Sequence, residues 1–383
     1  MPPDHMTGHM TKRDAIRRIA RDTGYSESSI YKILKNPFNF SKNAVDTVQA
    51  SAVRHGLTGE FLSEEPDPSQ HDPVISRHDP VTHMGGKRVL QIGVLIPSRP
   101  LYFWREAVMG MEKSRERVEK EYDITIRLRY TYYSYPFNET EGERLFANLA
   151  SEHLDALILY PVDGDACRRF LETGTRDTAV ILFNDTQTYM TDVWFAAHPN
   201  IGSIAPDCYD EGRRAARIIA EEGPAVRHVA VICARHNHGV QTSDQRALGV
   251  CDALSERCPE VRISRIVMDI AERMVPSMLA RRLMPCYSEC PVDALYITTG
   301  LTHIACAAVE KIERRLGVSL STFVIGHEFS PADKRYLLEG RQRGYIKQDV
   351  YTQGHVAIRD AVAAALGIKS PPRCLYQSSV FMR

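Results

Sequence analysis

The sequence lacks the long hydrophobic runs and the charge excess that mark several protein classes. Its 383 residues contain no run of about 18 consecutive apolar residues, so no transmembrane helix and no membrane partner are expected. The first 14 residues have no apolar segment typical of a secretory signal. The 48 basic and 48 acidic residues cancel, and 43% hydrophobic residues exclude a largely disordered chain. We therefore expect a globular protein of the cytoplasm.

The sequence also lacks paired cysteines and the motifs of common enzymes. None of its nine cysteines forms a CxxC pair, so reduced thiols are expected, and no metal or other cofactor is predicted. Phosphate-binding glycine loops, a GxSxG nucleophile turn and an HExxH zinc motif do not occur. His236 and His238 are typical of a polar loop, and Asp163 and Asp165 of a turn. No catalytic residue is predicted, and the protein is not expected to be an enzyme.

The neutral total hides an uneven charge distribution. Residues 11–57 carry nine basic and four acidic side chains, an excess of five positive charges. Residues 63–86 are rich in Pro, Asp and His, without apolar periodicity, which is the composition of a linker. We predict a basic head at 10–58, a polar linker at 59–87 and a body at 88–383.

The head has the pattern of three short helices. Ile16, Ile19 and Ala20 lie at helical spacing, and Gly24 then provides a stop. Ser26 caps a second helix, with Ile30, Ile33 and Leu34 facing inward, that ends before Pro37. Ser41 begins a third, with Val45, Val48 and Ala52 inward. This is the helix-turn-helix pattern, and the basic residues around it favour DNA binding over a helical bundle for protein contacts.

In the body, short strand-like runs alternate with helical stretches. The expected strands are Val89–Ile96, Ile124–Tyr130, Ala156–Leu159, Ala179–Phe183, His228–Cys233, Arg262–Val267, Ala294–Ile297 and Phe323–Ile325. Between them lie helical stretches such as Trp104–Lys120, Asp207–Glu222, Gln245–Arg257 and Ile304–Leu316. This alternation predicts an α/β fold with two doubly wound, parallel-sheet lobes. Ligands in such sheets bind beyond the carboxyl ends of the strands, so residues just past each strand are the candidates.

The order of these pieces resembles the lactose-repressor/galactose-repressor (LacI/GalR) family of bacterial transcription regulators. In the head the likeness is carried by IARDTGYSESSIYKILKNP, and in the body by VLQIGVLIPS, LDALILYP, IAPDCYDEGRRAA, QRALGVCDAL, DALYITTGLTHIACAAVE, VIGHE and YIKQDVYTQG. The resemblance implies a body of the periplasmic-binding-protein type, with crossovers between lobes near 203–207, 345–348 and 368–372. It also implies a homodimer that binds operator DNA and a small carbohydrate-like effector.

The resemblance further implies which residues make contacts. For DNA it implies Glu27, Ser28, Ser29 and Lys32, and the polar and basic residues on and around the second helix add Arg17, Ser26, Tyr31 and Asn36. For the ligand it implies Phe103, Trp104, Asp207, Arg246, His327, Glu328 and Gln348, and the position just past a strand adds Asp185, Thr299 and Thr302. Other roles stay open for some of them: Trp104 as a core anchor, Arg246 as a bridge between helices and Glu328 as a strand-end cap.

The chain departs from the family pattern at two places that concern function. The Asn-Asp pair that usually follows the strand at 294–297 is replaced by Thr299-Gly300, which removes one carboxylate expected to hold a ligand. After Gly56-Leu57 the chain reads TGEFLSEEPDP in place of the family's hinge segment, so a hinge helix is not expected. The main hypothesis is an effector-controlled repressor, and the alternatives are a cytosolic solute-binding sensor and a sugar-acting α/β enzyme.

Overall fold

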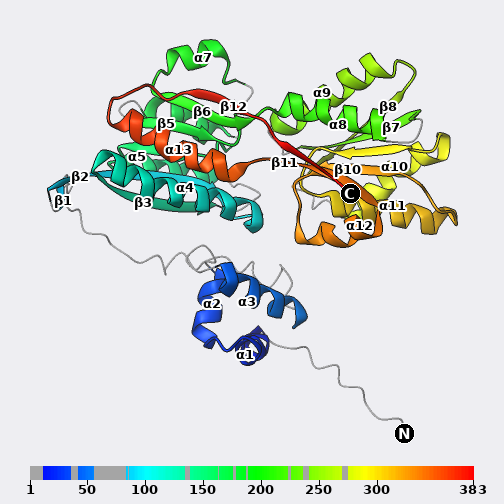
Figure 1. Cartoon of the computed structure of the whole chain (residues 1–383), viewed down its shortest axis with the longest axis horizontal. Helices are drawn as coiled ribbons and strands as arrows, with labels where there is room; N and C mark the ends of the chain where they lie inside the picture. The colour runs from blue at the N-terminus through cyan, green and yellow to red at the C-terminus, as the bar shows by residue number, and fades with distance from the viewer. Residues whose placement is uncertain are drawn as a thin grey trace, which may run out of the picture. The chain divides into compact units, whose positions relative to one another are not determined.

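The computed structural model describes residues 12–35, 42–55, 83–84, 86–133, 139–162, 164–175, 178–186, 189–222, 226–235, 241–269 and 275–383. The chain divides into two compact units, residues 1–79 and residues 80–383, which are called the head and the body below. Figure 1 shows three helices in the head and two lobes in the body.

The described head consists of α1 (Lys12–Thr23), α2 (Glu27–Lys35) and α3 (Lys42–Arg54). Ile19, Ile30 and Val48, one from each helix, are fully buried and form its small apolar centre. The prediction placed Ile16 inward as well, but its side chain is partly exposed and Ala15 is buried in its place. The shift of one position follows from the crossing of α1 with α3, which buries the face centred on Ile19.

In the head, α1 ends before Gly24 and α2 begins after Ser26, as the sequence predicts. Gly24 follows α1 with φ +73°, a left-handed conformation that favours glycine. Ser26 precedes α2, and its hydroxyl accepts a hydrogen bond from the Ser29 backbone N–H at 3.1 Å. Asp22 near the end of α1 accepts a hydrogen bond from the Ser51 hydroxyl at 3.1 Å and lies 2.7 Å from His55, which ties α1 to α3.

The first lobe of the body is built on a seven-stranded sheet in which β3, β2, β4, β5, β6 and β12 lie side by side and parallel. The short β1 pairs antiparallel with the start of β2. The elements of this lobe are β1 (His83–Met84), β2 (Lys87–Pro97), α4 (Leu101–Tyr122), β3 (Thr125–Tyr133), α5 (Glu139–Ser151), β4 (Ala156–Leu159), α6 (Asp165–Arg169), the π-helical turn η4 (Phe170–Gly174), β5 (Ala179–Phe183), α7 (Asp192–Ala197), β6 (Ile201–Pro206), α13 (Val350–Ala365) and β12 (Arg373–Tyr376).

The second lobe has a six-stranded sheet in the order β8, β7, β9, β10, β11, β13, parallel except for β13. Its elements are α8 (Cys208–Glu222), β7 (His228–Arg235), α9 (Gln241–Arg257), β8 (Arg262–Asp269), α10 (Pro276–Glu289), β9 (Ala294–Ile297), α11 (Thr302–Leu316), β10 (Phe323–His327), the 3-10 turn η5 (Pro331–Asp333), α12 (Lys334–Glu339), β11 (Gln342–Lys347) and β13 (Ser379–Met382).

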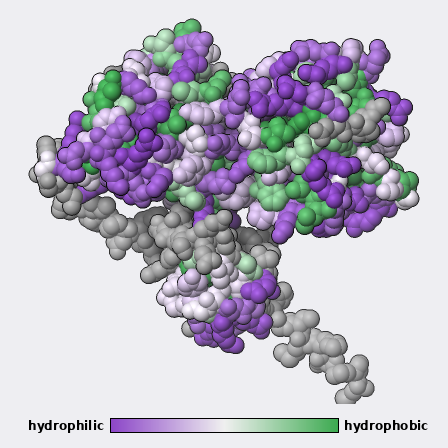
Figure 2. Space-filling model, in the orientation of Figure 1, coloured by the Kyte–Doolittle hydropathy of each residue, from purple (hydrophilic) through white to green (hydrophobic). Residues whose placement is uncertain are grey.

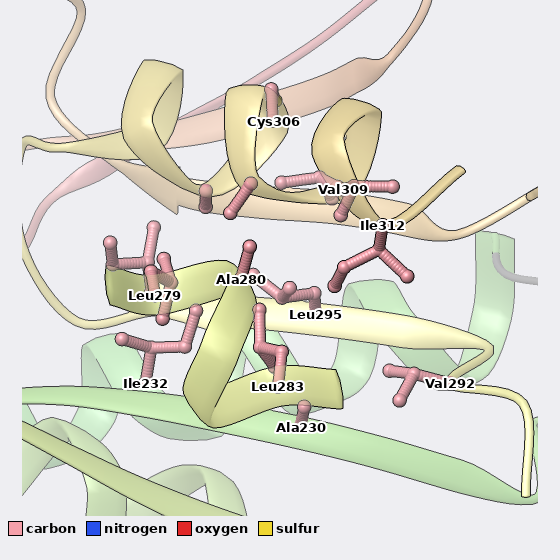
Figure 3. Close-up of a cluster of buried hydrophobic side chains, with 14 of the residues drawn as sticks. Ala230, Ile232, Leu279, Ala280, Leu283, Val292, Leu295, Cys306, Val309 and Ile312 are labelled. Atoms are coloured by element: carbon pink, nitrogen blue, oxygen red, sulfur yellow. The ribbon is translucent and has the colours of Figure 1, made fainter. Parts of the chain in front are cut away.

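Helices cover both faces of the second sheet, so its central strands are buried on both sides. Side chains of α10 and α11, such as Leu283 and Ile312, pack onto Leu295 of β9 on one face (Figure 3). On the other face α8 and α9 pack onto Tyr296 and its neighbours. The continuous apolar runs of the sequence reflect this two-sided burial, and the predicted α/β fold with two parallel-sheet lobes is confirmed.

The chain passes between the lobes at three places. They lie between β6 and α8, between β11 and α13, and between β12 and β13. The third crossover falls at 377–378, so the predicted position of 368–372 is wrong. The reason is β12, which pairs with β6 in the first sheet before the chain leaves that lobe.

The face of the body that Figure 2 shows is mostly hydrophilic, with smaller hydrophobic patches on both lobes. Among the described residues, no helix is both long enough and apolar enough to cross a membrane.

Candidate functional site

Buried polar side chains gather where the strands of both lobes end and the crossovers run. Asn184 and Asp185 follow β5 in the first lobe, while Thr298 and Thr299 follow β9 in the second. All of these side chains are buried except that of Thr299, which is partly buried. Both pairs stand at the carboxyl ends of parallel strands, which is the usual ligand position in open α/β sheets. We call these side chains and the buried or partly buried polar ones that contact them the interlobe cluster. Its members are Tyr102, Asn184, Asp185, Glu211, Arg246, Thr298, Thr299, His327, Glu328, Gln348 and Gln353.

Arg246 and Glu211 form the charged centre of the cluster. Arg246 lies on α9 and Glu211 on α8, and their side chains are only 6% and 1% exposed. The Arg246 Nε donates to Glu211 at 2.6 Å, and Nη1 donates to the Thr298 carbonyl at 2.9 Å. Arg246 therefore does bridge two helices, yet its Nη2 is buried without a hydrogen-bond partner.

His327 ends β10 beside this pair. Its Nε2 lies 2.5 Å from the Tyr296 hydroxyl, and its Nδ1 lies 3.8 Å from Glu211 and has no hydrogen-bond partner. Burial lowers the pKa of His327 well below its ordinary value, and the Arg246 guanidinium adds to this effect. The imidazole is therefore neutral, able to donate or accept one hydrogen bond at Nδ1 according to its tautomer.

Glu328 and Gln348 connect the second lobe to the first. The Gln348 backbone N–H donates to the Glu328 carboxyl at 3.0 Å, and Asn184 of the first lobe donates to the Gln348 side chain at 2.7 Å. The same Asn184 amide donates to Gln353 of α13 at 3.0 Å. Burial raises the pKa of Glu328 to about 8, so its carboxyl is mostly protonated at neutral pH. Glu328 directly follows β10 and has φ +55°, a left-handed backbone conformation that turns the chain at the strand end.

The first lobe contributes aromatic side chains at the same edge. Trp104 of α4 packs edge-on against Tyr160 with ring centroids 5.2 Å apart, and against Phe103 at 5.0 Å. Its Nε1 donates to the Arg99 carbonyl at 2.8 Å, and the side chain is 4% exposed. These contacts make Trp104 an anchor of the lobe's aromatic core. The Tyr160 hydroxyl donates to Asp185 at 3.3 Å.

Two side chains of α4 in the first lobe contact the second lobe. A Cβ added to Gly300 would lie 3.0 Å from the Tyr102 hydroxyl, so this α4 side chain reaches the end of β9. Burial raises the pKa of Tyr102, with the Glu328 carboxyl adding to it, so the phenol stays protonated. Farther along α4, Glu106 forms an ion pair with Lys347 at 3.0 Å.

Several predicted ligand residues meet in this cluster, and Thr302 and Asp207, like Trp104, also make structural contacts. Thr302 is fully buried beneath Gly326, where an added Cβ would lie 2.0 Å from the Thr302 hydroxyl. Asp207 caps α8, since its carboxylate accepts the Asp210 backbone N–H at 3.0 Å. Sequence reasoning pointed to Tyr102 and Asn184 only as part of the stretches just past strands, without giving them a role, and it missed Glu211 and Gln353. Asn184 directly precedes the predicted Asp185, and Glu211 stands within IAPDCYDEGRRAA, so both were within reach of the same motifs.

The cluster offers hydrogen-bonding atoms that the described residues leave unused. Arg246 Nη2, His327 Nδ1, Thr299 Oγ1 and Gln353 Nε2 are buried without a partner. A buried unpaired polar atom costs about 1–3 kcal/mol, and so many in one place indicate a site for a polar ligand. Among the described residues, no group of three or more His, Cys, Asp or Glu side chains is arranged to hold a metal ion.

In the head, the residues predicted to contact DNA lie on and around α2. Ser26, Glu27 and Ser28 are exposed, and Tyr31 is 48% exposed. Ser29 is partly buried, with its hydroxyl 2.9 Å from that of Ser26. A half-exposed pair links Arg17 to Glu27 at 3.5 Å. Lys32 lies in α2, but its side chain is not among those described, and Asn36 lies outside the described residues.

The two lobes, three crossovers and buried polar cluster define a two-lobed small-molecule-binding fold. A family model described as periplasmic binding protein domain matches residues 92–369, so the chain belongs to that family. No curated protein gives a significant sequence match.

Solved structures share the fold at low sequence identity. A glucose-galactose binding protein, GanP from Geobacillus stearothermophilus, has a TM-score of 0.62 at 20% identity, covering 77% of this chain and 98% of its own. A protein assigned as a LacI transcriptional regulator from Bacteroides fragilis has a TM-score of 0.63 at 15% identity, covering 77% of this chain and 97% of its own. The transcriptional regulator CelR, in complex with cellobiose, has a TM-score of 0.58 at 15% identity, covering 96% of this chain and 98% of its own.

Proposed function

We propose that this protein is a transcription regulator, a repressor, whose affinity for operator DNA is controlled by a carbohydrate-like effector bound at the interlobe cluster. The observation that carries the proposal is the alignment with CelR over 96% of this chain, which takes in the head as well as the body. A helical head combined with a periplasmic-binding-protein-like body fits a regulator better than a transport protein. Such a regulator acts where the DNA is, in the cytoplasm.

The head supports the DNA-binding half of the proposal. Residues 11–57 carry five excess positive charges, which favour phosphate contacts, and α2 exposes Ser28 and Tyr31 for contacts to bases. A homodimer would present two heads to a pseudo-palindromic operator.

The body supports the effector half. The unpaired donors of Arg246 and Gln353 belong to opposite lobes, so one ligand bonded to both would favour one arrangement of the lobes. A ligand shifts such an equilibrium only by its difference in affinity for the two arrangements. Several solved relatives hold sugars, D-arabinose and D-allose among them, which supports a carbohydrate-like effector here.

Footprinting of the full-length protein on DNA from upstream of its own gene tests the proposal, with salt varied from about 50 to 200 mM. We expect a symmetric protected site and affinity that falls steeply with salt. Tyr31→Ala should weaken the footprint at least tenfold, whereas Ser255→Ala, exposed on α9 of the body, should leave it unchanged. Nonspecific binding without a footprint would contradict the proposal.

The second candidate is a solute-binding sensor without specific DNA binding, which the likeness of the body to GanP favours. The two candidates differ in the footprint alone, because both bind a small molecule in the body. A protein that binds sugars but protects no DNA would establish the second.

A further inference from the structure

We propose that Glu211 sets the ligand specificity of the interlobe cluster, making it select uncharged polyhydroxylated ligands and reject sugar acids and sugar phosphates. This inference rests on the proposed binding of an effector between the lobes and narrows the chemical class of that effector. It does not depend on DNA binding, so the two can fail separately.

The first step is the position of Glu211. Its carboxylate is 1% exposed and accepts a hydrogen bond from Arg246 Nε at 2.6 Å. The other oxygen accepts one from the Ser378 hydroxyl, in the third crossover. Both carboxylate oxygens are thus used within the protein, and Glu211 is fixed by α9 on one side and by the crossover on the other. It compensates the charge of Arg246 in every ligand state that keeps this geometry.

The second step is the charge that remains around Arg246. The other titratable groups of the cluster are Asp185, His327, Glu328 and the Tyr102 phenol, and the Tyr296 phenol contacts His327. Burial holds His327 neutral, keeps the Glu328 carboxyl largely protonated at neutral pH and raises the pKa of both phenols, while Asp185 is a buried carboxyl. Lys347, a cation close enough to act on Glu328, is paired with Glu106 at 3.0 Å. Among the described residues, the cluster therefore holds no uncompensated positive charge for an anionic ligand.

The third step is what the unpaired atoms can bind. Arg246 Nη2 and Gln353 Nε2 are donors, and the Thr299 hydroxyl both donates and accepts. A sugar hydroxyl accepts and donates in turn, so it satisfies such atoms without bringing charge. A carboxylate or phosphate would need the full charge of Arg246 and would lie near Glu211, where two like charges repel in a poorly solvated place.

The test on the wild-type protein compares matched ligands by calorimetry. The probes are D-glucose, D-galactose and D-ribose, each against its anionic counterpart: D-glucose 6-phosphate, D-galacturonate and D-ribose 5-phosphate. We expect at least one neutral sugar to bind, with its anionic counterpart at least tenfold weaker. Equal or tighter binding of an anionic counterpart overturns the proposal, and so does binding by none of the neutral sugars. Either result leaves the footprint prediction standing.

The variant Glu211→Gln tests the residue itself. Glutamine keeps the length and an acceptor for Arg246 Nε but removes the compensating charge. We expect the ratio of neutral to anionic affinity to fall at least tenfold, about 1.4 kcal/mol. The matched control is Glu256→Gln, because Glu256 pairs with Arg213 between the same two helices at 2.9 Å but is 58% exposed. An unchanged ratio in a folded Glu211→Gln protein, or the same change in Glu256→Gln, overturns the assignment. If Glu211→Gln does not fold, the wild-type comparison still decides the class of ligand.

Discussion

At the residue scale, Glu328 combines an ionisable carboxyl with a position that water barely reaches. It is 7% exposed, and its carboxyl accepts the Gln348 backbone N–H at 3.0 Å. Burial raises its pKa from an ordinary value of 4.5 to about 8. Between these two pH values the folded chain keeps the proton and the unfolded chain releases it, so ionisation of Glu328 lowers stability as pH rises through this window.

Replacing Glu328 by glutamine removes this titration and keeps the side-chain oxygen that accepts the Gln348 N–H. We expect the free energy of unfolding of Glu328→Gln, relative to wild type, to increase from pH 5 to pH 8 and to level off above. The limiting slope is about 1.4 kcal/mol per pH unit, and the observed slope should be smaller where the site relaxes. Urea denaturation of both proteins at several pH values measures it. A difference that does not change with pH would contradict a raised pKa.

At the element scale, α8 and α9 approach each other through a pair of glycines. A Cβ on Gly212 would lie 2.2 Å from the Arg246 carbonyl oxygen, and one on Gly249 would lie 2.1 Å from that of Tyr209. Neither backbone can accept a methyl group at such a distance without moving. The close approach also places Glu211, next to Gly212, against Arg246. The helix crossing and the ion pair therefore depend on each other.

The variant Gly249→Ala should push α9 away from α8. We expect a loss of about 1–3 kcal/mol in the free energy of unfolding, because overpacking of this size forces the backbone to shift. Alanine is the better helix former by about 1 kcal/mol, so a net loss would come from packing alone. Urea denaturation measures it, with Ser255→Ala on the exposed side of α9 as the control. A Gly249→Ala protein as stable as wild type would mean that the helices separate freely.

Several strands were predictable from their continuous apolar runs, although β6 (Ile201–Pro206) is buried throughout and was missed, and β3 has a mixed pattern and was predicted. The predicted strands at 89–96, 156–159 and 179–183 coincide with β2, β4 and β5, because burial on both faces makes them continuously apolar. No strand was predicted for β11 or β12, whose burial alternates between inward and outward residues. The third crossover, which the family resemblance placed near 368–372, instead follows β12.

The candidate site was predictable only as far as strand ends and motifs reach. Arg246, His327 and Gln348 could be named because each stands just after a strand or in a quoted motif. Glu211, the partner of Arg246, could not be named from the sequence. The two residues are 35 positions apart and meet only because α8 and α9 cross. The contact of the Thr302 hydroxyl with Gly326 could not be foreseen either, because the sequence does not reveal that these two residues meet.

At the scale of the whole molecule, the head and the body each bury their own apolar residues. Ile19, Ile30 and Val48 form the centre of the head, whereas the body has larger clusters in each lobe. Two units with separate cores need not unfold together, and a ligand stabilises only the unit that it binds.

We therefore expect two transitions when the full-length protein is heated in a calorimeter. A neutral sugar at about 100 times its Kd should add about 2.7 kcal/mol to the stability of the body and raise that transition by several degrees. The smaller transition of the head should stay in place with sugar and rise when operator DNA is added.

The variant Asp22→Asn removes the carboxylate that joins α1 to Ser51 and His55, so it should lower the head transition alone. A single transition that moves with sugar, with DNA and with Asp22→Asn alike would show one cooperative unit. In that case the effector signal would pass from body to head through shared stability, and the separate cores would not describe how the chain unfolds.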